Sequence, residues 1–343
     1  MKKILFGLVA LLGVVTLVAC SESNEGDSSE GGEQVVNVYS SRHYDSDRDL
    51  FERFEAETGI RVNVLEGTTV ELLERVNRES NNPQADLFID VGVLALYEFI
   101  RDDLLEDHQS SIGSQLEEGM YGQQWLALTN RARAIVIDNE TFPDGFELRS
   151  YLDLARPEFE GEILTRSSTN IYNIALMAAI IQTEGEDVAV EFAQGIVRNM
   201  ARDPEGNDRD QARAMIAGEG NFSLMSTYYI QMLRISSDAD ETMVGDRLGI
   251  AFPEETFVDI SWMGVINGAA NRDNAVLLME FMLTEEAQTQ TMMLNGELPV
   301  HVNVPIADEL LELYQFDRLE LNYEELGRYM IRAMMIMDEA GWR

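Results

Sequence analysis

The sequence predicts an α/β protein built as two lobes. Its 343 residues, of which 45% are hydrophobic, suffice for one large core or two medium ones. Short apolar runs alternate with amphipathic segments from Val35 onward, and residues 272–295 and 306–341 have a mostly helical pattern. The units are spaced too irregularly for a barrel of eight equal repeats, so two α/β lobes with late helices fit better.

The first predicted unit is a strand, a helix and a second strand. VVNVYS is followed by DSDRDLFERFEAETG, in which Leu50, Phe51 and Phe54 share one face, and then by IRVNVLEG. The three residues Asp45 to Asp47 supply candidate N-caps, and Gly59 is a plausible helix end. Such a βαβ unit has parallel strands.

The alternation continues along the chain. TTVELLERVNRES predicts an amphipathic helix, ADLFIDVG a buried strand and ALYEFIRDDLLED another helix. QWLALTNRARAIVIDNE predicts two apolar strands, interrupted by Arg131 and Arg133. Further helices are expected near 171–184, 187–200, 208–218 and 227–235, with strands in RLGIAFP and VDISWMGVING.

The first 33 residues predict export and tethering. Residues 1–19 have a Lys2-Lys3 head and an apolar run from Ile4 to Val18, the pattern of a signal peptide and too short for a stable membrane span. LVAC resembles a lipoprotein signal, in which Cys20 is lipidated and anchors the chain at the outer face of the cytoplasmic membrane, at the cell surface or in the periplasm. The alternative is an ordinary secretory signal with an incidental cysteine. Residues 20–33 then form a flexible acidic linker, and a single cysteine allows no internal disulfide.

The charge excludes one class of partner. The formal net charge is −37, and it becomes −39 when Lys2 and Lys3 leave with the signal. Nucleic acid is therefore not an expected partner. No lysine follows Lys3, a composition that fits either a surface adapted to high salt or high pH or compositional drift of the genome.

Candidate site residues occur in three places. His43 and Tyr44 come after the first predicted strand. Tyr172, in RSSTNIYN, and the pair Tyr228 and Tyr229, in STYYI, lie in the first turns of predicted helices with Ser, Thr or Asn as candidate caps. Ligands of open α/β sheets bind beyond the carboxyl ends of strands. Two tyrosines in one helical first turn diverge by only about 100°, so both phenol oxygens can meet one small ion.

Phenolate and imidazole together suit a hard, highly charged ion, above all Fe(III). Four phenolates around Fe(III) leave one net negative charge, which a nearby arginine would balance. Arg166 and Arg42 are the candidates, with Arg133 and Arg209 behind them. Alternatively, fewer tyrosines bind and an anion such as carbonate completes the shell. The competing interpretation is that these tyrosines only pack against one another.

Several motifs resemble the ferric-iron-binding proteins of ABC importers, in the branch with a His-Tyr pair and three further tyrosines. The specific matches are SSRHYD, RSSTNIYN and TYY, within an ordered resemblance over most of residues 35–290 that weakens after about Leu294. The resemblance implies a metal site made of His43, Tyr44, Tyr172, Tyr228 and Tyr229. It implies a lesser candidate ligand in Glu66 and second-layer or anion-binding roles for Arg166, Arg42 and Arg209.

The same resemblance implies a type II, transferrin-lobe-like periplasmic-binding-protein fold with a hinge and an interlobe cleft. Lobe 1 would comprise 34–132 plus about 259–308, and lobe 2 would comprise 133–258 plus about 309–343. The implied function is capture of ferric iron by a monomeric lipoprotein that delivers it to an ABC permease.

Two alternative functions remain at this stage. An ABC-importer binding protein for an organic anion or polyamine would use the tyrosines as an aromatic box. A surface hydrolase would use paired carboxylates or Ser167 and Ser168, but no P-loop, GxSxG, HExxH or CxxC motif is present in the sequence, and an enzyme is not expected.

Overall fold

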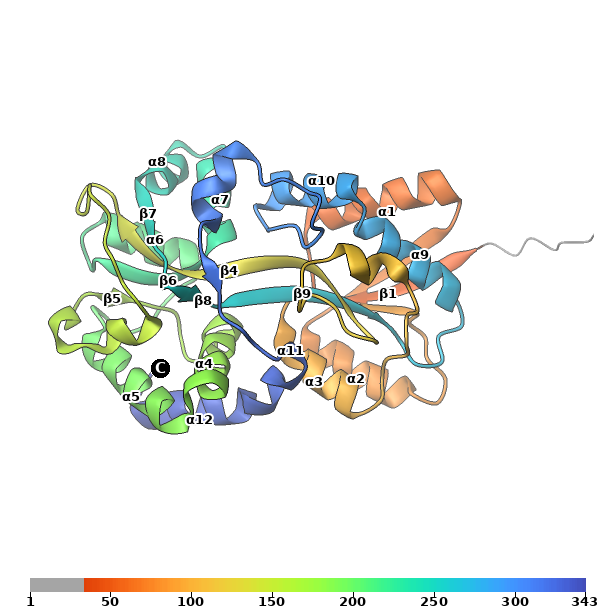
Figure 1. The fold of residues 1–343 in the computed structure, drawn as a ribbon, viewed down its shortest axis with the longest axis horizontal. Coiled ribbons are helices and arrows are strands. Elements are labelled where there is room, and N and C mark those ends of the chain that lie inside the picture. Colours follow the sequence, from red (N-terminus) through yellow and green to blue (C-terminus); the bar gives the residue numbers. More distant parts are fainter. Residues whose placement is uncertain (1–33) are drawn as a thin grey trace, which may run out of the picture. The chain divides into compact units, whose positions relative to one another are not determined.

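A mixed eight-stranded sheet runs through residues 34–343, the part of the chain that the computed structural model describes (Figure 1). The predicted signal peptide, Cys20 and the acidic linker lie outside the described residues. In spatial order the strands are β2 (Arg61–Glu66), β1 (Val35–Ser40), β3 (Leu87–Asp90), β9 (Val258–Val265), β4 (Leu126–Asp138), β6 (Phe222–Ser226) and β5 (Ile163–Leu164), with β7 (Leu248–Ala251) also paired to β4.

Two antiparallel strands, β4 and β9, join the two halves of this sheet (Figure 1). On one side β9 pairs with β3, which continues in parallel to β1 and β2. On the other side the second part of β4, from Arg133, pairs with β6 and β7, and β5 lies parallel to β6. A short parallel pair, β8 (Glu255–Thr256) and β10 (Asp317–Arg318), lies outside the main sheet. The first βαβ unit is parallel, as predicted.

Helices pack on each half of the sheet. In the half that contains β1 they are α1 (Asp45–Thr58), α2 (Thr69–Glu79), α3 (Leu96–Arg101), α9 (Arg272–Met282) and α10 (Glu285–Asn295), with 3₁₀ turns η1 (Val93–Ala95) and η2 (Ser111–Gln115). In the half that contains β6 they are α4 (Ile171–Glu184), α5 (Glu186–Asn199), α6 (Asp208–Ile216), α7 (Thr227–Arg234) and α8 (Ala239–Arg247), with η3 (Tyr151–Ala155) and η4 (Pro157–Phe159).

The C-terminal segment returns across both halves. It comprises η5 (Asp308–Tyr314), α11 (Tyr323–Leu326), η6 (Gly327–Tyr329) and α12 (Met330–Ala340). In this segment α11 packs against α3, whereas α12 packs against α4 and α5. The chain therefore ends on the half that contains β6.

Two sequence predictions about these elements were wrong. Residues 126–138 form one strand, β4, in which every residue is buried, so Arg131 and Arg133 interrupt nothing. The N-cap of α1 is Tyr44 rather than one of the residues Asp45 to Asp47, and Asp47 instead binds Arg42. The predicted helix end at Gly59 is confirmed, because this glycine has a φ of 74°.

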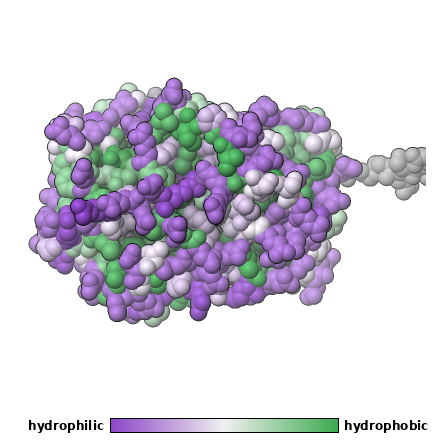
Figure 2. Space-filling view, viewed as in Figure 1, coloured by the Kyte–Doolittle hydropathy of each residue, from purple (hydrophilic) through white to green (hydrophobic). Residues whose placement is uncertain are grey.

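Aromatic and aliphatic side chains form the core beneath the sheet. Phe88, Phe99 and Trp262 pack ring against ring with centroids 4.3 to 5.7 Å apart. A second cluster, which includes Ile230 and Leu233 of α7, anchors that helix. Figure 2 shows a face on which hydrophilic side chains cover most of the surface, with smaller hydrophobic areas between them. Within residues 34–343, no helix has the length and apolarity needed to cross a bilayer.

The end of α10 makes a close contact with α7. Gly296 caps α10 with a φ of 69°, and a Cβ at this position would lie 2.7 Å from Cβ of Gln231 on α7. Only glycine accommodates both the backbone conformation and the approach of the neighbouring helix. Gly59 has a similar φ of 74° but nothing within 4 Å of its Cβ position.

These two glycines give a matched test of that contact. Gly59→Ala should lower the free energy of unfolding by about 1 kcal/mol, because it forces a left-handed conformation on a residue with a Cβ. Gly296→Ala should cost about 3 kcal/mol, because it adds overpacking against α7. Urea unfolding of both variants measures the difference, and equal losses would show that the α10–α7 contact is loose.

Candidate metal centre

The candidate residues all follow carboxyl ends of strands in the two halves of the sheet. His43 and Tyr44 follow β1, Tyr172 lies in the first turn of α4 after β5, and Tyr228 and Tyr229 open α7 directly after β6. Asn170 caps α4 by accepting a hydrogen bond from the backbone N–H of Asn173. These local structures place the tyrosines at the topological position where α/β sheets bind ligands.

The structure brings the four tyrosines together. The phenol oxygens of Tyr172 and Tyr228 lie 3.2 Å apart, and the rings of Tyr228 and Tyr229 have centroids 4.1 Å apart. Tyr44 reaches this cluster from the other half of the sheet, close enough for its charge to raise the pKa of Tyr228. Tyr172 and Tyr228 are buried, and Tyr44 and Tyr229 are half-buried.

Loss of hydration raises the pKa of three of these phenols, those of Tyr44, Tyr172 and Tyr228. It raises the pKa of Tyr172 to about 12, although the Arg131 guanidinium opposes the shift. It also raises the pKa of Tyr44 and Tyr228 well above the ordinary value for tyrosine, and the charges of neighbouring tyrosines add to the effect. An ion that binds phenolates here must therefore displace protons by its own charge.

His43, the residue before Tyr44, lies beside an acidic side chain. Its Nδ1 is 3.3 Å from Oε2 of Glu66, and its side chain is 54% exposed. Arg48 donates a hydrogen bond to Glu66, which lowers the pKa of that carboxyl group, and the contact with His43 adds to the shift. With Nδ1 facing Glu66, the Nε2 atom is the ring nitrogen left for a ligand.

A network of buried charges lies behind the tyrosines in the half that contains β1. The Arg42 guanidinium lies 4.6 Å from the ring centroid of Tyr44 and binds both Asp47 and Glu297. Arg131 lies 5.4 Å from the ring centroid of Tyr172 and also binds Glu297. Burial would raise the pKa of Glu297, but these two guanidiniums hold it below its usual value.

A second network lies on the side of β6. Asp208, at the start of α6, accepts hydrogen bonds from Arg133 at 2.7 Å and from Arg166 at 2.6 Å. Arg166 lies 6.0 Å from the ring centroid of Tyr172. The third predicted arginine, Arg209, is placed differently, because its guanidinium pairs with Glu241 of α8 at 3.7 Å.

Sequence reasoning missed most members of these networks. Arg131, Asp208, Asp259 and Glu297 were not named as site residues, yet all are buried next to the tyrosines or their arginines. The signal that could have found them is the pair of arginines in an otherwise apolar run, since a buried guanidinium requires a buried carboxylate. The sequence does not show which carboxylate that is.

A pocket of about 520 Å³ adjoins Arg166. Its walls come from both halves of the sheet: the start of α2, with Thr68 and Val70, faces the loop before α4, with Ser167 and Thr169. Within residues 34–343, no group of three or more His, Cys, Asp or Glu side chains is arranged to hold a metal ion. The four clustered tyrosines bring together oxygen donors of the kind that suits a hard cation.

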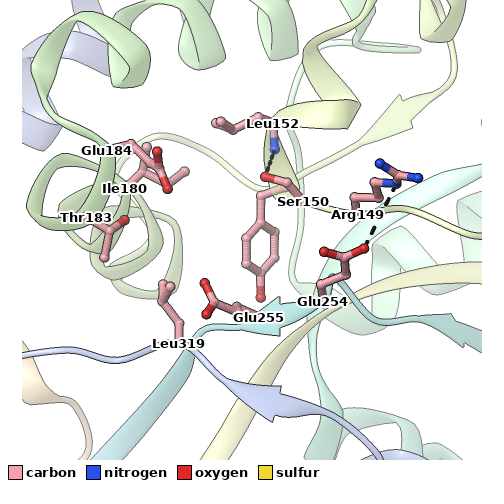
Figure 3. Close-up of a pocket in the computed structure, with 10 residues that line it drawn as sticks. Arg149, Ser150, Leu152, Ile180, Thr183, Glu184, Glu254, Glu255 and Leu319 are labelled. Atoms are coloured by element: carbon pink, nitrogen blue, oxygen red, sulfur yellow. Dashed lines mark hydrogen bonds and ion pairs between the residues drawn. The ribbon is translucent and has the colours of Figure 1, made fainter.

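Another pocket, of about 390 Å³, is lined by none of the candidate site residues (Figure 3). Tyr151 is one of the lining residues, and its hydroxyl donates a hydrogen bond to the Arg133 carbonyl oxygen. Glu184, Glu254 and Glu255 give the pocket an acidic lining, and Arg149 contacts Glu254 at 4.0 Å.

The Asp208 network predicts a large stability cost. Asp208→Asn leaves Arg133 buried without its carboxylate, so we expect the free energy of unfolding to fall by about 3 kcal/mol. Urea unfolding measures the loss. Asp203→Asn, at an exposed position before α6, serves as the control and should change the value by less than about 0.5 kcal/mol. Equal effects would contradict the buried pairing.

The raised pKa of Tyr172 predicts an alkaline loss of stability. Because the folded protein holds this phenol neutral, the stabilisation is complete below pH 10, the ordinary pKa, and is lost as the pH rises toward 12. Tyr172→Phe removes this titration. The alkaline decrease in the free energy of unfolding should therefore be about 2 to 3 kcal/mol smaller in the variant than in the wild type. Unfolding curves between pH 9 and about 11.5 test it, and parallel pH dependences of wild type and variant would contradict it.

Comparison with curated proteins shows extended similarity to iron-binding proteins. Iron uptake protein A1 of Synechocystis sp. is 35% identical, in an alignment that covers 97% of this chain and 95% of that protein. The major ferric iron-binding protein of Neisseria meningitidis is 22% identical over 90% of this chain and 93% of its own length.

Solved structures and a family model agree with this similarity. A ferric binding protein from Campylobacter jejuni has 34% identity and a TM-score of 0.82, and a Trichodesmium protein (IdiA, FutA) in complex with iron and citrate has 35% identity and a TM-score of 0.84. Each match covers 90% of this chain and 100% of the other, which confirms the predicted two-lobed α/β fold. A family model described as bacterial extracellular solute-binding protein matches residues 82–325. The chain belongs to this family of bacterial extracellular solute-binding proteins.

Proposed function

We propose that this protein captures ferric iron between its two lobes outside the cytoplasm and delivers it to an ABC permease. The observation that carries the proposal is the convergence of four phenol groups from both halves of the sheet, with Tyr172 and Tyr228 in direct contact. The similarity to iron uptake and ferric-binding proteins supports the same cargo. Fe(III) is the biological cation that phenolate oxygens suit best.

The proposed ligands come from opposite sides of a cleft. His43 and Tyr44 belong to lobe 1, which we assign to 34–132 plus about 259–308. Tyr172, Tyr228 and Tyr229 belong to lobe 2, assigned to 133–258 plus about 309–343. An ion held by both sets favours the closed arrangement of the lobes, because only that arrangement supplies all the donors.

Capture requires that protons leave. Each phenol that binds iron releases its proton, and the charge of Fe(III) supplies the free energy that overcomes the raised pKa values. Glu66 holds His43 through Nδ1, so we assign it a supporting contact rather than a bond to iron. A small anion such as carbonate would complete the shell beside Arg166 if fewer phenolates bind.

The contacts disfavour the two alternative functions. An aromatic box for a polyamine needs free ring faces, but Arg42 and Arg131 already lie over the rings of Tyr44 and Tyr172. A hydrolase needs a base beside its nucleophile, whereas the Ser167 hydroxyl hydrogen-bonds to the Thr169 hydroxyl at 2.8 Å.

The location and partners belong to the same proposal. Lipidation of Cys20 would hold the folded part near the membrane that contains the permease, with residues 20–33 as the linker. We propose that the protein acts as a monomer, since each chain carries a complete set of the five proposed ligands.

A ferric titration tests the function. Addition of a ferric chelate to the purified protein should produce a visible phenolate-to-iron charge-transfer band that saturates at one ion per chain. Tyr172→Phe and Tyr228→Phe should each weaken or shift the band, because each removes one donor oxygen. Absence of the band at every chelate ratio would contradict the proposal and direct the search toward organic solutes.

A matched variant separates ligation from general effects of removing a phenol. Tyr121 is 44% exposed and lies before β4, apart from the four clustered tyrosines, so Tyr121→Phe should leave the band unchanged. Equal changes in Tyr121→Phe and Tyr228→Phe would show that the band does not report a specific site.

A further inference from the structure

One buried carboxylate connects the arginines of the metal centre. Glu297 is fully buried and accepts two hydrogen bonds from Arg42, at 2.9 and 3.2 Å, and one from Arg131 at 3.3 Å. The Thr129 hydroxyl and the Asn295 amide donate two more, at 3.1 and 3.3 Å.

The position of Glu297 also links it to the tyrosines of both lobes. Gly296, the preceding residue, lies against α7, and its Cβ position is 3.5 Å from the Tyr228 carbonyl oxygen. Arg42 and Arg131, the two guanidiniums that Glu297 binds, lie over the rings of Tyr44 and Tyr172. The turn at 295–297 therefore contacts α7 through its backbone and the other tyrosines through the two arginines.

We propose that Glu297 is a positioning residue that fixes Arg42 and Arg131 over the ligand tyrosines and, by offsetting the positive charge of these guanidiniums, favours Fe(III) over Fe(II). This inference rests on the proposed function. A buried charge acts strongly because little water screens it. A negative charge behind the phenolates stabilises the more positive oxidation state, and it also keeps the two guanidiniums from neutralising the phenolates.

The test compares two buried carboxylates. Glu297→Gln keeps the size of the side chain but removes its charge. In the iron-loaded protein, the ferric/ferrous midpoint potential should shift to a more positive value, and the charge-transfer band should shift to a shorter wavelength. Asp86→Asn is the control, because Asp86 is 1% exposed and binds Asn37 and Asn271 at the amino ends of the strands, away from the tyrosines. Asp86→Asn should lower the stability of the protein and leave the midpoint potential and the charge-transfer band unchanged.

The outcomes are distinguishable. If the wild type shows no charge-transfer band, the proposed function fails. If the wild type shows the band and folded Glu297→Gln has the same potential and band position, the function stands and this inference is overturned. If Glu297→Gln does not fold, the same potential and band are measured for Asp259→Asn, since Asp259 is the other carboxylate bound to Arg131. An unchanged potential and band in folded Asp259→Asn would then overturn the inference. An equal shift in Asp86→Asn would also overturn the inference, because the effect would then be a general one.

Discussion

The ion pairs of Arg131 are the interaction on which the rest of the structure depends. This guanidinium lies fully buried in the middle of β4, the strand that joins the two halves of the sheet. Without partners it would cost several kcal/mol. Its partners come from distant segments: Asp259 from β9 and Glu297 from the turn after α10. Closing the core around β4 therefore requires these segments to meet where the two halves join, and the tyrosines lie over that junction.

Local patterns predicted the fold because they report local constraints. The apolar face of α1 and the left-handed turn at Gly59 depend on neighbouring residues only, and both are found in the structure. The break predicted within residues 126–138 failed for a physical reason. Hydropathy scores an arginine as a surface residue, whereas Arg131 and Arg133 are neutralised by carboxylates more than 70 positions away in the sequence. Pairing over that distance leaves no local pattern.

The same distinction applies to the candidate metal centre. The sequence pattern predicted that Tyr44 follows a strand and that Tyr172, Tyr228 and Tyr229 lie in the first turns of capped helices. Their mutual approach required the three-dimensional structure, as did the contact that places His43 on Glu66. The structure places the three predicted arginines differently. Arg42 and Arg166 lie beside tyrosines, whereas Arg209 pairs with Glu241 on another helix.

The charge balance around the tyrosines differs from the one that the sequence suggested, and this difference affects the proposed binding of iron. The sequence suggested that a nearby arginine would balance an iron centre with four phenolates. In the structure, the four arginines nearest the tyrosines form ion pairs with four buried carboxylates, so this layer of charged side chains behind the tyrosines is formally neutral. The arginines are Arg42, Arg131, Arg133 and Arg166, and the carboxylates are those of Asp47, Asp208, Asp259 and Glu297. Such a layer orients the phenols without attracting an anion strongly in the absence of iron. Under the proposed function, the charge of the ferric ion and the protons that it displaces would set the affinity, and closure would follow from proposed ligands that only the two lobes together supply.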